Sequence, residues 1–438
     1  MQSSSFWFDY FEENPLADDL ADDIRHNGAI SRFSRPDWHL LMTPVVYPND
    51  VIKKQTYMLS QLFAMIEHLP KMAFDDQVRD FLVAVGFHDE NVITLAERLS
   101  TYTGLIPCRW DILDNGTDWK VMEVNVGGAI GGFAYDGIQT LYDDALAQEK
   151  QDSPSVSVDE YWQSPYAHIA PKVEQEMAAL DKPLLVVVDD ALQFTESPLV
   201  ANSASGALSA RLNQEIVAIP HTKLGDIIES HDGSVLVFEV FTLSDIARAS
   251  DNSYSPYLDG LESGKVHSVI HPLSEVFMSK AILALLREER VLSVLSNEQR
   301  DIINTLIPQT FIVSTDNLDQ LLALNKNDWV IKDAIGYGGH GVFCGWECGS
   351  EEWTALLNKV AQAESPTAII QHKIRGKREA AISMTPKGVF VESNEASVLG
   401  VFMLGDEFGG GCVRQSLSGK GVVCTANHAA LGVMRVQK

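Results

Sequence analysis

The chain has 438 residues and a formal net charge of -27 at pH 7, so it is long enough for two or three domains with substantial cores. So large an excess of acidic groups argues against nucleic acid or an anionic membrane as a partner, because both would repel the chain. An acidic N-terminus without a signal-peptide pattern, no apolar run of membrane-helix length and five unpatterned cysteines predict a cytoplasmic protein with free thiols.

The first hundred residues are predicted to be mainly helical. Apolar residues recur at helical spacing over 51–69 and again over 78–99, with polar residues between them. An aromatic group near the N-terminus is expected to anchor this region by packing, and it comprises Phe6, Trp7, Phe8, Tyr10 and Phe11.

A predicted hairpin follows, with the sequence CRWDILDNGTDWKVMEVNVGG. The Asn-Gly dipeptide between its two apolar-rich runs is a strong hairpin signal. Alternate side chains of a strand share a face, so Arg109 lies on the same side as Asp111, and Glu123 on the same side as Asn125. If the two strands pair, one face gathers two carboxylates, an amide oxygen and a guanidinium.

Such oxygens are the ligands that Mg²⁺ takes when a nucleotide's phosphates also hold it. Asp111, Glu123 and Asn125 are therefore candidate metal ligands. The alternative is that they are solvated polar positions on an amphipathic hairpin, because short motifs often match by chance.

Strands that alternate with helical stretches are predicted beyond the linker QDSPSVSVDE. Residues 184–188 have the composition of a buried strand that ends in two aspartates, and 215–219 and 234–241 also have strand character. This alternation predicts a small α/β layer with a parallel sheet.

Two lysines stand at patterns suited to phosphate binding. Lys280 begins an apolar helical run, and Lys332 lies on an apolar strand that leads into a glycine-rich loop, WVIKDAIGYGGHGVF. Dense glycines let backbone N–H groups approach a polyphosphate, and the lysine adds a charge beside it. The loop is neither a Walker A motif nor a dinucleotide fingerprint, and a plain hairpin tip is the alternative. Its candidate phosphate-binding residues are Gly336, Gly338, Gly339 and Gly341.

Two further residues belong to the candidate site. Gln371 lies where a short apolar strand breaks into polar residues, and the backbone donors and acceptors of such a strand end are suited to an adenine edge. Arg414 follows a glycine segment at a predicted strand and is a candidate for binding a substrate carboxylate. A surface salt bridge is the alternative for Arg414.

A second Glu-x-Asn pattern, formed by Glu392 and Asn394, competes with the hairpin as the metal site. Arg378 stands where the hairpin has Arg109, but Ala380 stands where it has its aspartate, so this register has one carboxylate fewer. We therefore prefer the hairpin, and we assign Glu392 and Asn394 to a strand end or to the substrate pocket.

The order and spacing of these motifs resemble the ATP-grasp superfamily, and in particular the circularly permuted branch typified by the synthetase domain of glutathionylspermidine synthetase. The resemblance covers roughly residues 100–420. It implies an α/β (α+β) class and a circularly permuted ATP-grasp fold in five parts. These are a mainly helical N-terminal region (1–100), a metal- and substrate-binding part of the ATP-grasp domain (101–180), a small Rossmann-like pre-ATP-grasp domain (181–270), an ATP-binding lid (271–380) and a C-terminal return to the core (381–438).

The resemblance also implies an ATP-dependent carboxylate–amine ligase that forms an amide through an acyl phosphate and releases ADP and phosphate. ATP and Mg²⁺, with two ions expected, would serve as cofactors, and Arg109 would act on the transferred phosphoryl group. Small-molecule acids and amines would be the partners, and both a monomer and a homodimer are compatible with the sequence. After Glu-x-Asn the resembling enzymes carry serines, whereas this chain has VGGAIGG, so neither substrate is identified. Alternatives are a non-catalytic nucleotide-binding subunit and a phosphotransferase that stops at a phosphorylated product.

Overall fold

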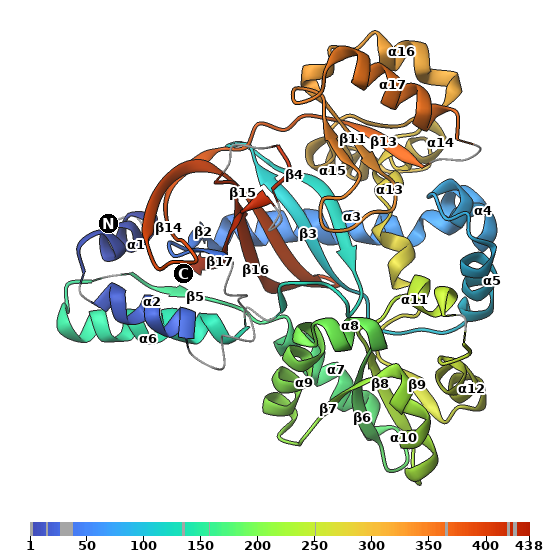
Figure 1. Ribbon diagram of the computed structural model, residues 1–438, viewed down its shortest axis with the longest axis horizontal. Coiled ribbons are helices and arrows are strands. Elements are labelled where there is room, and N and C mark those ends of the chain that lie inside the picture. Colours follow the sequence, from blue (N-terminus) through green and yellow to red (C-terminus); the bar gives the residue numbers. More distant parts are fainter. Residues whose placement is uncertain are drawn as a thin grey trace.

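Three β-sheets organise the protein in this computed structural model. The structure describes residues 3–14, 16–26, 38–133, 136–156, 158–249, 251–363, 367–417, 421–423 and 427–438. Figure 1 shows a large mixed sheet at the centre, an antiparallel sheet with covering helices above it and a parallel sheet below it. None of the described helices is both long enough and apolar enough to span a membrane.

The first hundred residues form helices and add two short strands to the large sheet. The stretch 78–99 divides into two helices, because Gly86 turns the backbone to a φ of 97° and Asp89 caps the next helix by accepting the N–H of Asn91. The elements are α1 (Ser3–Glu13), α2 (Leu16–His26), β1 (His39–Leu41), β2 (Val45–Pro48), α3 (Asn49–Phe74), α4 (Val78–Ala84) and α5 (Glu90–Leu99).

The N-terminal aromatic group packs into the body of the protein. Trp7 is fully buried, contacts Tyr142 edge-on with ring centroids 5.2 Å apart, and donates from Nε1 to Glu160 Oε2 at 2.8 Å. Arg435 in the last strand donates from Nε to the same carboxylate oxygen at 3.1 Å. Glu160 therefore joins the beginning of the described chain to its end.

The described strands of the large sheet follow the order β14-β1-β17-β16-β15-β3-β4, with β2 and β5 also paired to β17. The long β15 pairs with β14 through its first half and with β16 and β3 through its second half, so that β14, β1, β17, β16 and β15 close into a ring of paired strands. The remaining bounds are β3 (Pro107–Asp114), β4 (Trp119–Val126), β5 (Glu160–Tyr161), β14 (Arg378–Met384), β15 (Phe390–Leu404), β16 (Glu407–Gln415) and β17 (Ala430–Gln437).

Apolar cores cover both faces of this sheet. On one face Trp110 of β3 meets Phe63 of α3 with ring centroids 6.1 Å apart. On the other face strand residues such as Phe402 pack with α6 (Asp136–Asp152) and α7 (Tyr166–Ala178). Arg109 and Asp111 alternate with Trp110 along β3, so they point away from α3.

The parallel sheet belongs to a small α/β unit with the strand order β7-β6-β8-β9. β6 reads LLVVVD and is almost wholly buried, as expected for a parallel strand covered by helices on both faces. The elements are β6 (Leu184–Asp189), α8 (Ala191–Glu196), α9 (Leu199–Leu212), β7 (Val217–Pro220), α10 (Leu224–Ser230), β8 (Val235–Glu239), α11 (Leu243–Arg248), α12 (Ser255–Ser263) and β9 (Val266–Ser268).

The antiparallel sheet has the order β10-β13-β11-β12. One of its faces packs on α16 and α17, and the other meets α13 through Ile369 of β13. The elements are the 3₁₀-helix η3 (Ser274–Met278), α13 (Ala281–Leu285), α14 (Glu289–Leu292), α15 (Asn297–Leu306), β10 (Thr310–Ile312), α16 (Leu318–Leu322), β11 (Trp329–Asp333), β12 (Val342–Cys344), α17 (Ser350–Ala361) and β13 (Ala368–His372).

Candidate active site

The β3–β4 hairpin brings four of the predicted site residues onto one face of the large sheet. Arg109 pairs with Asn125, and Asp111 pairs with Glu123, across the two antiparallel strands. Side chains of directly opposed residues are neighbours on the same face. The Asn115 side chain fixes the turn, because its Oδ1 accepts two backbone N–H groups of the connection.

A β-bulge lies beside this group. The strand register shifts just beyond the Asp111–Glu123 pair, which leaves Met122 as the extra residue of β4. Bulges redirect backbone groups and often occur next to functional sites. Here the carbonyl of Met122 accepts a hydrogen bond from Lys332 Nζ at 3.1 Å, so the bulge connects the large sheet to the antiparallel sheet.

Asp111 lies at the centre of a buried ion cluster. It is 2% exposed, and its Oδ1 accepts Arg109 Nε at 2.8 Å while its Oδ2 accepts Arg109 Nη2 at 3.3 Å and also Arg414 Nη2. Burial alone would raise the pKa of Asp111, but the two guanidiniums lower this pKa well below its usual value, so the carboxylate stays ionised. Two cations around one anion leave this position able to bind a further anion.

Lys280 faces the hairpin from the start of α13. Its Nζ lies 3.3 Å from Glu123 Oε2 and donates to the carbonyl of Gly336 at 2.9 Å, and its backbone N–H donates to Ala334 at 2.9 Å. The lysine therefore bridges the hairpin and the glycine-rich segment, although all three are far apart in the sequence.

Lys332, on β11 of the antiparallel sheet, also contacts the hairpin, at the Met122 carbonyl. Its Nζ donates to Gln371 Oε1 at 2.7 Å, and Gln371 Nε2 donates to Thr310 Oγ1 at 3.2 Å. Burial lowers the pKa of Lys332 to about 8, with Glu123 opposing this shift and Lys280 adding to it. The ammonium group is therefore poorly solvated and would gain from a nearby anion.

The segment 336–341 forms a glycine loop between β11 and β12. Gly338, Gly339 and Gly341 have φ values of 62°, 82° and 69°, a region that favours glycine. At Gly341 a Cβ would also lie 1.9 Å from Asp333 Oδ2, so only glycine fits. The loop lies beside Asn125 and Lys280, which line one small pocket together with Gly336.

The carboxylates are engaged by cations in this arrangement. Among the described residues no three His, Cys, Asp or Glu side chains gather closely enough to hold a metal ion. Asp111 binds two arginines and Glu123 binds Lys280, whereas the Nδ2 of Asn125 is buried without a hydrogen-bond partner.

The competing register lies elsewhere on the sheet. Glu392 and Asn394 are exposed, in the half of β15 that pairs with β14, whereas Gly400 in the other half pairs with Asp111. Of the cysteines, Cys424 lies outside the described residues, and the others, which are Cys108, Cys344, Cys348 and Cys412, are free thiols.

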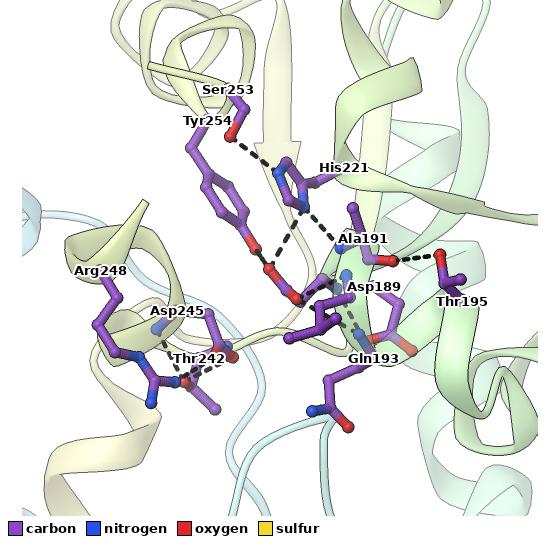
Figure 2. Close-up of polar contacts among 12 residues, drawn as sticks. Asp189, Ala191, Gln193, Thr195, His221, Thr242, Asp245, Arg248, Ser253 and Tyr254 are labelled. Atoms are coloured by element: carbon purple, nitrogen blue, oxygen red, sulfur yellow. Dashed lines mark hydrogen bonds and ion pairs between the residues drawn. The ribbon is translucent and has the colours of Figure 1, made fainter. Parts of the chain in front are cut away.

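A second polar cluster, which sequence reasoning did not assemble, lies at the carboxyl end of the parallel sheet (Figure 2). The His221 ring stacks on Tyr254 with centroids 3.9 Å apart, and its Nε2 lies 2.9 Å from Ser253 Oγ. Tyr254 donates from its hydroxyl to Asp190 Oδ2 at 3.0 Å, and Asp190 caps α8. Three connections of the small unit, after β6, after β7 and before α12, therefore meet at one point.

Serine, histidine and aspartate are the residue types of a hydrolytic triad, but the hydrogen bonds here contradict that role. His221 Nδ1 accepts the backbone N–H of Ala191 at 3.0 Å, while Asp190 Oδ2 lies 3.6 Å away. The ring proton therefore sits on Nε2, which donates to Ser253 and cannot remove its proton. The cluster fixes the loops at this edge of the sheet.

Sequence reasoning also missed two residues at the glycine loop. Tyr337 donates from its hydroxyl to Glu275 Oε1 at 2.5 Å across 62 positions of the chain. In the sequence, an aromatic residue within an otherwise glycine-rich segment was the available sign that Tyr337 has a specific contact. Glu275 follows no motif, and only the fold places it beside the loop.

Comparison with known proteins finds similarity in structure rather than in sequence. No protein-family model and no curated protein matches the chain. Among solved structures, a glutathione synthetase-like effector from Globodera pallida, in its apo form, is similar over 97% of this chain and 98% of its own, with a TM-score of 0.62 and 12% identity. The chain shares that protein's fold. A protein of Methylobacillus flagellatus, provisionally named a gamma-glutamylcysteine synthetase, matches over 85% of this chain and 84% of its own, with a TM-score of 0.37 and 12% identity.

Proposed function

We propose that the protein is an ATP-dependent carboxylate–amine ligase of the circularly permuted ATP-grasp type. A substrate carboxylate oxygen would attack the γ-phosphorus of ATP, the bond to the β-phosphate would break, and ADP would leave. An amine nitrogen would then attack the acyl carbon, and phosphate would leave as the amide forms and the amine proton passes to solvent.

The observation that carries this proposal is the convergence of cations from four separate elements around the β3–β4 hairpin. Arg109 and Arg414 meet at Asp111, and Lys280 and Lys332 approach the hairpin from α13 and β11. Phosphoryl transfer depends mainly on positioning and on neutralising charge. In a chain with a net charge of -27, four cations around one hairpin make a local site for an anionic nucleotide.

The donor set also fits a nucleotide with its magnesium. The Nδ2 of Asn125 is buried without a hydrogen-bond partner, and this N–H donor suits a phosphate oxygen, while the Oδ1 of the same amide would be the metal ligand. Glu123 is engaged by Lys280, a contact that can be exchanged when a phosphate takes the lysine. Asp111, Glu123 and Asn125 would hold Mg²⁺, with two ions expected, and the metal would neutralise phosphate charge. Glu392 and Asn394 are exposed, which argues against a role at the metal, and we assign them to a strand end or to the substrate pocket.

The other proposed roles follow from position. Lys280 and Lys332 would bind the phosphates, and the loop glycines Gly336, Gly338, Gly339 and Gly341 would present backbone N–H groups to them. Gln371 lies beside Lys332 and would mark the adenine end of the cleft. Arg109 would contact the transferred phosphoryl group, and Arg414 the substrate carboxylate, because guanidiniums bind both in a bidentate manner.

Strand order supports the permuted arrangement. β3 and β4 precede the antiparallel sheet in the chain, yet β3 pairs with β15, which follows it. The proposed domains keep the boundaries 1–100, 101–180, 181–270, 271–380 and 381–438, with 101–180 and 381–438 sharing the large sheet.

The test is ADP release by the full chain with Mg-ATP and pooled small-molecule acids and amines. A ligase requires both an acid and an amine for sustained release. Release that needs only one of them would identify a phosphotransferase, and ATP binding without release would identify a nucleotide-binding subunit. Either result would overturn the proposed function.

A further inference from the structure

Glu275 joins the glycine loop to the small α/β unit. It lies in η3, is 3% exposed and accepts two hydrogen bonds, one on each carboxylate oxygen. Oε1 accepts the hydroxyl of Tyr337 at 2.5 Å, and Oε2 accepts the backbone N–H of Ser244 at 2.7 Å. A buried carboxylate is thus engaged on both oxygens by partners that lie on different parts of the fold.

The first partner comes from the loop that would cover the phosphates. Tyr337 is 49% exposed, so its ring is not held by a core, and its hydroxyl is the part that is fixed. Within the described part of the chain, residues 336–341 are tied to side chains elsewhere through this hydroxyl and through the Gly336 carbonyl, which binds Lys280. A phosphate would draw Lys280 away, which leaves the Tyr337 hydroxyl as the remaining one of these two side-chain contacts, beside the backbone bond from the Asp333 N–H to the Gly341 carbonyl at 2.9 Å that closes the loop.

The second partner comes from the first turn of α11. Thr242 and Asp245 form a capping box there, which fixes the backbone at the start of this helix. The N–H groups of a first helical turn attract a carboxylate. Glu275 is therefore oriented by the small unit and presents its other oxygen to the loop.

We propose that Tyr337 and Glu275 are positioning residues that hold the glycine loop over the nucleotide and align it with the small α/β unit. Their part in catalysis rests on the proposed function, whereas their hold on the loop does not. Neither residue would touch the reacting atoms. They act through the backbone of the loop, which would supply the phosphate contacts.

The test uses Tyr337→Phe, which keeps the ring and removes the hydroxyl. Tyr57→Phe is the matched control, because the Tyr57 hydroxyl donates to Glu298 at 3.0 Å on an exposed surface away from the loop. Ser244→Ala is a second control, since it leaves the backbone N–H in place. Glu275→Gln is the conservative variant, because an amide still accepts from Ser244 and offers an N–H to the tyrosine oxygen.

The first readout is hydrogen exchange of residues 334–343 in the full chain without nucleotide. Tyr337→Phe is expected to raise exchange there about tenfold, the size of effect of one hydrogen bond to a charged group. Tyr57→Phe and Ser244→Ala should match the wild type, and Glu275→Gln should stay close to it. Wild-type protection in Tyr337→Phe would overturn the proposal whatever the protein's activity is.

The second readout is the Kd for Mg-ATP. Tyr337→Phe is expected to weaken binding about tenfold, while both controls bind as the wild type does. Unchanged or tighter binding in Tyr337→Phe would overturn the positioning role. A wild-type chain that binds no ATP would instead overturn the proposed function, and the exchange measurement would still decide the loop contact.

Discussion

The charge of Lys332 should change within a pH range in which ATP binding can be measured. Burial lowers its pKa from 10.5 to about 8, so the folded protein sheds this proton at a lower pH than the unfolded chain. Between about pH 8 and 10.5 the unfolded state holds more protons, and this group's contribution to the free energy of unfolding therefore rises with pH. Below about pH 8 the lysine is charged and able to attract a phosphate.

We predict that ATP binding weakens as pH rises above about 8, and that Lys332→Met removes this dependence. At pH 7 the same variant should bind ATP about 10–100-fold more weakly, as expected for the loss of a charged hydrogen bond. Isothermal titration across pH 6.5–9.5 measures both effects, and circular dichroism checks that the variant is folded. Wild-type affinity in Lys332→Met would show that the lysine is structural.

Arg109 shares Asp111 with Arg414, so the two arginines can be separated by mutation. Arg109→Ala leaves Asp111 with one guanidinium and should lower kcat by about 10²–10³, as the loss of a charge-stabilising donor does. The KM for ATP should change much less, because the contact would strengthen only as the phosphoryl group moves. Steady-state kinetics separate the two constants, and unchanged kcat would remove Arg109 from catalysis.

Among the connecting elements, the glycine segment after β4 sets how closely the large sheet approaches the small unit. A Cβ on Gly128 would lie 1.9 Å from the Glu239 carbonyl at the end of β8, whereas a Cβ on Gly131 would meet only Arg109 Nη1, at 3.8 Å. A residue with a side chain could not be placed at Gly128 without moving the two parts apart.

We predict that Gly128→Ala lowers the free energy of unfolding by about 1–3 kcal/mol, the usual cost of forcing atoms into a packed contact. Gly131→Ala is the matched control and should unfold as the wild type does. Urea titration followed by fluorescence measures both. Equal stability of the two variants would mean that the sheet and the small unit can move apart to accommodate the methyl group without loss of stability.

Local signals explain which elements were predictable. The Asn-Gly turn and two apolar runs predicted the β3–β4 hairpin and its shared face, and the register of Arg109 with Asn125 agrees. The bulge at Met122 was not predictable, because its sequence has no mark of an extra residue. The break between α4 and α5 was missed because hydrophobic spacing continued across Gly86, whose positive φ ends the first helix.

At the scale of the whole molecule, the order of the motifs predicted which residues reach the hairpin, but it did not predict the contacts that those residues make. Lys280 and Lys332 were both predicted to lie at patterns suited to phosphate binding, and the structure brings both to the hairpin. The Glu275–Tyr337 contact depends on how the small unit meets the glycine loop. The His221 cluster depends on how three connections within the small unit converge, and no local signal encodes either arrangement. The Arg414–Asp111 bond required the strand order β16-β15-β3, which alternation of strands and helices does not specify.

The proposed ligase chemistry is tested most directly by the nucleotide product formed in the presence of hydroxylamine. The full chain would be incubated with Mg-ATP, pooled carboxylic acids and hydroxylamine, and the nucleotides and hydroxamates would be quantified by mass spectrometry. We predict ADP and phosphate, with one hydroxamate formed for each ADP, because hydroxylamine would attack the acyl phosphate in place of the amine. AMP and pyrophosphate, or ADP formed without any hydroxamate, would contradict this prediction.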